Sequence, residues 1–94
     1  MTTLATRIRE IGDLEGFDVE FYDQNWRVAD VKKNGFKKFY YDRKSKGSLS
    51  VSSWIEKRFR PVYPGYNCVV LNGDGTTAHG NTLLSSVRAT YEEE

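Results

Sequence analysis

The sequence has little of what disulfide scaffolds, metal proteins and membrane proteins require. It contains one cysteine and one histidine, and its longest apolar run is the four residues Cys68–Leu71. A single cysteine excludes an internal disulfide. One cysteine and one histidine are also fewer ligands than a zinc site usually has. Apolar runs this short fit neither a membrane span nor a signal peptide. We therefore expect a cytoplasmic protein without metal, cofactor or membrane partner.

Apolar and aromatic residues are frequent enough to build one small core. The chain has 94 residues, of which 38% are hydrophobic and 14% aromatic. Disordered chains are poorer in aromatic residues, so a folded unit is expected. A chain of this length accommodates one domain and not two. The expectation is a single domain over residues 1–94.

Positive charge is concentrated in the middle of the chain. Residues 27–60 contain eleven Lys and Arg against three acids, a net charge of +8, while the rest of the chain carries −7 and the whole chain only +1. This asymmetry indicates an anionic partner for the middle segment. The alternative is a solvated, dipolar surface that binds nothing.

Apolar residues at helical spacing mark the start of the chain. Leu4, Ile8 and Ile11 would share one face of a helix. Either Thr2 or Thr3 is a suitable N-cap, because a threonine hydroxyl can accept a hydrogen bond from a free backbone N–H. Gly12 is the natural end of this first helix.

Two later segments also have helical spacing. One covers residues 50–60, where Ser50 or Ser53 can cap a helix and Pro61 would end it. A strand is the less favoured alternative for these residues. The other segment, residues 82–91, fits a helix or an edge strand equally well. Between the two, Asn67–Leu71 is a short apolar run that predicts a buried strand.

After the first helix the apolar residues alternate along the chain, which is typical of strands. Strands are expected at residues 17–22, 26–33 and 36–42. A polar turn at Asp23-Gln24 would join the first two, and Asn34-Gly35 is a strong hairpin signal between the second and third. Two-residue turns at both places would place one set of apolar residues on the same face: Phe17, Val19, Phe21, Trp26, Val28, Phe39 and Tyr41.

The predicted fold is therefore α+β: a single small domain with a three-stranded antiparallel meander packed by helices. The element order is α-β-β-β-α-β, followed by a helix or a strand. Trp26 and Phe39 are expected to be buried on the face that the helices cover. A one-residue shift in register would move every side chain to the other face, so the coherent apolar face supports this alignment.

No residue pattern predicts catalysis, and the protein is not expected to be an enzyme. Cys68 lies in an apolar strand, where a reactive thiolate is disfavoured, so a nucleophile pair with His79 is not expected. The acids after the first helix are spaced like an exposed edge and are interpreted as solvated: Asp13, Glu15, Asp18, Glu20 and Asp23.

A glycine-rich loop at residues 73–82 could bind an anion. It precedes a possible helix, and free backbone N–H groups at a helix start favour negative charge. Gly80, Asn81 and Thr82 are the candidate residues. The loop lacks both the P-loop lysine and the dinucleotide-binding glycine spacing, so an ordinary connecting loop is the alternative.

The clearest functional signal is the mixture of basic and aromatic residues in segment 27–46. Aromatic side chains on a sheet can stack with bases while lysine and arginine neutralise phosphates. We predict a non-catalytic binding module whose leading partner is nucleic acid. The alternative is a protein-interaction module, such as an adaptor or an inhibitor of the kind that phages and mobile elements encode. The candidate residues are Arg27, Lys32, Lys33, Phe36, Lys37, Lys38, Tyr40, Arg43, Lys44 and Lys46.

Overall fold

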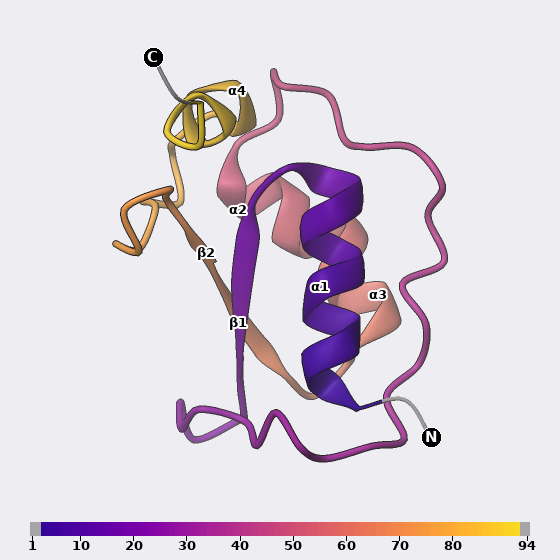
Figure 1. The fold of residues 1–94 in the computed structure, drawn as a ribbon. Helices are drawn as coiled ribbons and strands as arrows, with labels where there is room; N and C mark the ends of the chain where they lie inside the picture. The colour runs from indigo at the N-terminus through magenta and orange to yellow at the C-terminus, as the bar shows by residue number, and fades with distance from the viewer. Residues whose placement is uncertain (1–2, 93–94) are drawn as a thin grey trace.

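A computed structural model describes residues 3–92 of the chain, and it has helices around a two-stranded antiparallel sheet. The α+β class is therefore confirmed. In chain order the elements are α1 (Leu4–Glu15), β1 (Asp18–Tyr22), α2 (Val51–Trp54), the π-helical turn η1 (Ile55–Phe59), α3 (Arg60–Val62), β2 (Asn67–Leu71) and α4 (Leu84–Ala89). In Figure 1 a long segment without helix or strand leaves the end of β1 and runs around the outside of α1 to reach α2. We call this segment, residues 23–50, the strap.

The sheet joins two strands that are far apart in the sequence. β1 and β2 are antiparallel, with Asp18 opposite Leu71 at one end and Tyr22 opposite Asn67 at the other. The predicted strand at Asn67–Leu71 is confirmed. One face of the pair is buried and carries Val19, Phe21, Cys68 and Val70. The sequence predicted this alternation for β1, whereas it predicted a wholly buried strand for β2.

Helix α1 is longer than predicted. Thr3 is its N-cap residue, but its hydroxyl does not accept the predicted capping hydrogen bond, and Thr2 lies outside the described residues. The helix continues through Gly12 and ends at Glu15, and Gly16 then adopts a left-handed conformation with φ of 84°. Glycine is the usual residue for this conformation because it has no Cβ. Gly12 instead allows a close approach, since a Cβ there would lie 3.0 Å from Asp18 Oδ1.

The helix predicted over residues 50–60 is confirmed, although Pro61 does not end it. Ser50 caps α2, its Oγ accepting a hydrogen bond of 3.2 Å from the Ser53 N–H. The chain then widens into η1 and continues to Val62. Proline lacks the N–H that would bond to the carbonyl of Lys57, and its ring crowds that carbonyl in a regular α-helix. The wider π turn just before Pro61 relieves this crowding.

The end of the chain is helical as well. Residues 84–89 form α4, which decides between the helix and the edge strand that the sequence left open. Leu84 and Val87 are buried, so the apolar stripe faces the core. The residues following β2 turn back along it, with Leu71 bridging Thr77 and the Ala78 N–H donating to the Val70 carbonyl at 2.8 Å.

The predicted three-stranded meander is wrong. Residues 26–33 and 36–42 form no strand, and β1 pairs only briefly with the strap, through a bridge between Tyr22 and Val28. The predicted turn would have placed Val28 opposite Val19, three residues away from its observed partner. Because side chains alternate in a strand, an odd displacement moves them to the other face. Trp26 is accordingly 60% exposed and Val28 62% exposed.

The second predicted hairpin is absent because the start of α1 uses the same backbone. The Leu4 N–H donates to the Lys33 carbonyl at 2.8 Å, and the Ala5 N–H donates to the Val31 carbonyl at 2.9 Å. These bonds satisfy N–H groups that a helix leaves free at its start. Asn34 forms a β-bridge with Thr3, the residue before α1, and not with another residue of the strap.

Buried aromatic rings fill the core, and one of them comes from the strap. Trp54 is fully buried, and its ring lies 5.1 Å from Phe17 and 6.2 Å from Phe39 between centroids. Phe39 is 4% exposed, so its predicted burial is confirmed although the predicted strand is not. The neighbouring Tyr40 is 62% exposed. At this point the strap therefore buries one side chain in the core and presents the next one to solvent.

Two adjacent substitutions test how the strap closes the core. Phe39→Ala should lower the free energy of unfolding by about 3–5 kcal/mol, because it removes a buried ring and leaves a cavity. Tyr40→Ala should lower it by less than about 1 kcal/mol, because most of that side chain is in water. Urea denaturation followed by circular dichroism measures both. Equal effects of the two changes would contradict this arrangement of the strap.

Candidate nucleic-acid interface

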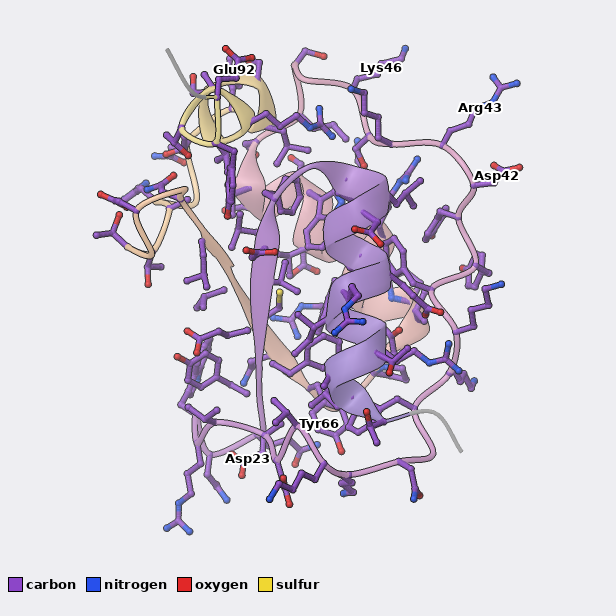
Figure 2. The ribbon with its side chains drawn as sticks, in the orientation of Figure 1. Asp23, Asp42, Arg43, Lys46, Tyr66 and Glu92 are labelled. Carbon is purple, nitrogen blue, oxygen red and sulfur yellow. The ribbon has the colours of Figure 1, made fainter. Side chains whose placement is uncertain are left out.

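Every basic residue predicted for the interface is exposed on the strap. Within residues 3–92, ion pairs involve only Arg7, Arg58, Arg60 and Arg88, none of which belongs to the strap. Figure 2 shows Arg43 and Lys46 pointing away from the body of the molecule at the outer edge of the strap. The exposed strap cations are Arg27, Lys32, Lys33, Lys37, Lys38, Arg43, Lys44 and Lys46.

The two predicted stacking residues lie in different environments. Phe36 is partly buried, with its ring centroid 5.8 Å from Phe21 and 5.1 Å from Tyr66. It belongs to the edge of the core. Tyr40 is mostly exposed and is the member of the predicted pair whose ring can meet a partner. A regular strand over residues 36–42 would have put both on the same face, because side chains an even number of residues apart point the same way.

Tyr40 is supported from behind by a second tyrosine and an arginine. The rings of Tyr40 and Tyr41 are 4.5 Å apart between centroids, and the Arg58 guanidinium lies 4.4 Å from the Tyr41 ring centre. Tyr41 donates a hydrogen bond of 3.3 Å to the Lys57 carbonyl in η1. The neighbouring Tyr40 hydroxyl, 3.3 Å away, is the main cause that raises the pKa of Tyr41. The cation–π contact and the hydrogen bond hold the Tyr41 ring, and the exposed Tyr40 ring packs against it.

The next part of the strap is anchored on a buried carboxylate. Glu15, at the end of α1, is fully buried. Its carboxylate accepts hydrogen bonds from the Ser45 N–H at 2.8 Å and the Ser45 hydroxyl at 3.2 Å, and ion pairs join it to Arg58 at 2.9 Å and Arg88 at 3.2 Å. The interpretation of Glu15 as a solvated acid is wrong. Its position four residues after Ile11, on the buried stripe of α1, is the sequence signal that pointed inward.

Anchoring Ser45 determines how its neighbours are presented. Ser45 is 4% exposed, whereas Lys44 and Lys46 on either side of it are exposed. Arg58 also donates a hydrogen bond to the Arg43 carbonyl, so the backbone is held on both sides of Lys44. The buried acid therefore places cations on the surface without pairing with them.

The positive surface is interrupted by acids at two places. Asp30 and Asp42 are exposed in the strap, and Asp42 lies beside Arg43 in Figure 2. Glu10 and Asp13 of α1 line a shallow depression of about 410 Å³ together with Lys38. Residues 31–41 contain four lysines and no acid. They are therefore the most uniformly basic part of the strap.

The loop predicted to bind an anion is used to cap a helix. The Val51 N–H donates to the Thr82 carbonyl at 2.9 Å, and the Ser52 N–H donates to the Gly80 carbonyl at 3.0 Å. The Asn81 N–H is itself bound to His79 Nδ1 at 3.0 Å. An ordinary connecting loop that caps α2 would make the same hydrogen bonds. Anion binding by Gly80, Asn81 and Thr82 stays a prediction.

The surroundings of Cys68 and His79 differ from those of a reactive pair. Cys68 is 5% exposed, and burial raises the pKa of its thiol far above neutral pH. His79 is exposed and holds the Asn81 N–H with its Nδ1 atom. A neutral, buried thiol is a poor nucleophile.

Other kinds of site are not found in the described part of the chain. Residues 3–92 contain no group of three or more His, Cys, Asp or Glu side chains placed to hold a metal ion. No helix in the same residues combines the length and apolar character that a bilayer crossing requires. Comparisons with family models, curated proteins and solved structures found no match to this chain. Its function is therefore argued from its own residues.

The buried acid can be tested by removing its charge alone. Glu15→Gln should lower the free energy of unfolding by about 2–4 kcal/mol, because two arginines lose their counter-charge. This expected loss is smaller than that for a fully buried ion pair, because the Arg58 and Arg88 side chains are 19% and 16% exposed. Glu10→Gln, which breaks a more exposed pair on the same helix, is the matched control and should cost less than about 1 kcal/mol. Thermal and urea unfolding of both variants gives the comparison, and equal losses would contradict the anchoring role.

Proposed function

We propose that this protein is a non-catalytic module that binds nucleic acid along its strap. The proposal rests on the exposure of the strap cations and on their lack of ion pairs within the described residues. Eight are exposed, and none has an ion-pair partner within residues 3–92, although four arginines outside the strap do. Exposed cations without an ion pair among these residues can neutralise the charges of a phosphate backbone.

The strap is also fixed in place, which favours binding. The Lys37 carbonyl accepts a hydrogen bond of 2.8 Å from the Tyr63 hydroxyl, and the Phe36 carbonyl accepts one of 3.2 Å from Arg7. Together with the bonds from the start of α1, these contacts hold the backbone between residues 31 and 37. A phosphate backbone that meets these lysines does not have to order the segment first, so less conformational entropy is lost on binding.

A protein partner is the second candidate function. Val28 and Val31 are 62% and 44% exposed on the strap, and exposed apolar side chains are typical of surfaces that contact other proteins. An adaptor or an inhibitor of another protein would use such a surface. Binding through apolar side chains falls little with added salt, whereas binding through several phosphate contacts falls steeply.

Charge removal along the strap tests the nucleic-acid proposal. Lys37→Gln, Lys38→Gln and Lys44→Gln should each weaken binding to a similar extent for every sequence. Each should also flatten the slope of log K against log salt by about one, because one fewer counterion is released. The measurement is fluorescence anisotropy with labelled oligonucleotides at several salt concentrations.

Lys57 provides the matched control for these variants. It is an exposed lysine on η1, outside the strap. Lys57→Gln should leave both the affinity and the salt slope unchanged. Absence of binding at low salt, or equal effects of Lys57→Gln and the strap variants, would rule out the strap as the binding surface.

A further inference from the structure

Trp26 is exposed in a turn that holds its backbone in an unusual conformation. Its φ is 59°, and no other non-glycine residue among residues 3–92 has a positive φ. A positive φ is uncommon for a bulky side chain, so surrounding contacts must stabilise it. Its side chain, an apolar surface 60% exposed, gains little from the core of the protein. Neither feature serves the fold in an evident way.

Asp23 supplies the contacts that fix this turn. The Asp23 carboxylate accepts the N–H groups of Asn25 at 2.8 Å and Arg27 at 3.0 Å. Its carbonyl accepts the Trp26 N–H at 3.0 Å, and its own N–H donates to the Arg27 carbonyl at 2.8 Å. The Asn67 side chain of β2 donates to the same Asp23 carbonyl at 3.2 Å. The turn is thus attached to the sheet and keeps the indole in solvent.

Exposed cations lie close to Trp26 in the sequence of the strap. Arg27 follows Trp26 directly, and Lys32 and Lys33 lie in the next turn of the strap; all three are exposed. The Tyr22 ring is 5.9 Å from the indole between centroids and supports it on the strand side. An exposed aromatic face in a segment rich in exposed cations suits a nucleotide, whose base stacks while its phosphate is neutralised.

The acids near the turn are engaged with donors of the protein itself. The Asp23 carboxylate holds two backbone N–H groups, as described above. The Glu20 carboxylate accepts a hydrogen bond of 3.3 Å from the Tyr22 hydroxyl, and the Asp30 carboxylate accepts the Lys32 N–H at 2.9 Å. These hydrogen bonds hold the three carboxylates against donors of the protein itself.

We propose that Trp26 stacks on an unpaired base and thereby makes the strap prefer single-stranded over duplex nucleic acid. This inference rests on the proposed function, because the strap cations supply most of the binding. In a duplex each base is already stacked on its neighbours, so its face cannot reach the indole. Single strands offer free base faces to aromatic side chains.

The test combines tryptophan fluorescence with affinity. Trp54 is fully buried, so quenching by an added oligothymidylate should come from Trp26. Trp26→Ala should abolish the quenching and weaken single-strand binding by about 5- to 150-fold, the range expected for one stacked base. Binding of duplex DNA of the same length and of inorganic polyphosphate should stay unchanged. Val28→Ala, a change at another exposed apolar residue of the strap, is the control and should alter none of these values.

The outcomes separate this inference from the proposed function. Selective loss of single-strand affinity in Trp26→Ala supports the stacking role. If the parent protein binds nucleic acid in a salt-dependent way but Trp26→Ala binds single strands equally well, the inference is wrong and the proposed function stands. An equal loss for single strand, duplex and polyphosphate also overturns it. If the parent protein binds none of the three at low salt, both proposals fail.

Discussion

The Glu15 carboxylate is the contact on which the arrangement of this protein depends. A fully buried carboxylate is costly unless hydrogen bonds and opposite charges replace its water. Here the replacements come from three separate places: Ser45 in the strap, Arg58 in η1 and Arg88 in α4. Arg88 also donates from Nε to the Glu15 carbonyl at 2.6 Å. One side chain at the end of α1 therefore joins the strap, η1 and α4.

This anchoring explains how a long segment without regular structure has a defined path. Irregular segments are ordered only when their backbone polar groups find partners. Helix α1 binds the Val31 and Lys33 carbonyls, Tyr63 binds the Lys37 carbonyl, and Glu15 binds the Ser45 N–H. Apolar contacts add Phe39, which closes the core over Trp54. The lysines and arginines of the strap are exposed along this anchored path.

Local patterns predicted the parts of the fold that local interactions decide. The helical stripes, the Ser50 cap and the strand at Asn67–Leu71 follow from periodicity and capping. The pairing of β1 with β2 does not, because the strands are separated by the strap and the second helical segment. The hairpin signal at Asn34-Gly35 was outweighed by hydrogen bonds to α1, and the Asp23 turn displaced the register. Exposure of the lysines followed from their charge, whereas the different surroundings of Phe36 and Tyr40 depended on a tertiary arrangement that the sequence does not show.

The contacts of the acids in the described residues explain why the strap cations have no ion pairs there. A net charge of +1 would allow most cations to be neutralised within the molecule. Instead, several acids bind backbone N–H groups in their own turns, as Asp23, Asp30 and Asp74 do. For Asp74, hydrogen bonds from Thr76 hold the pKa of the carboxyl below its usual value, because they favour its charged form. Glu15 is directed into the core. Because these acids stabilise turns and core contacts, the strap cations are left to interact with solvent or with a partner, and the charge asymmetry in the sequence persists on the surface.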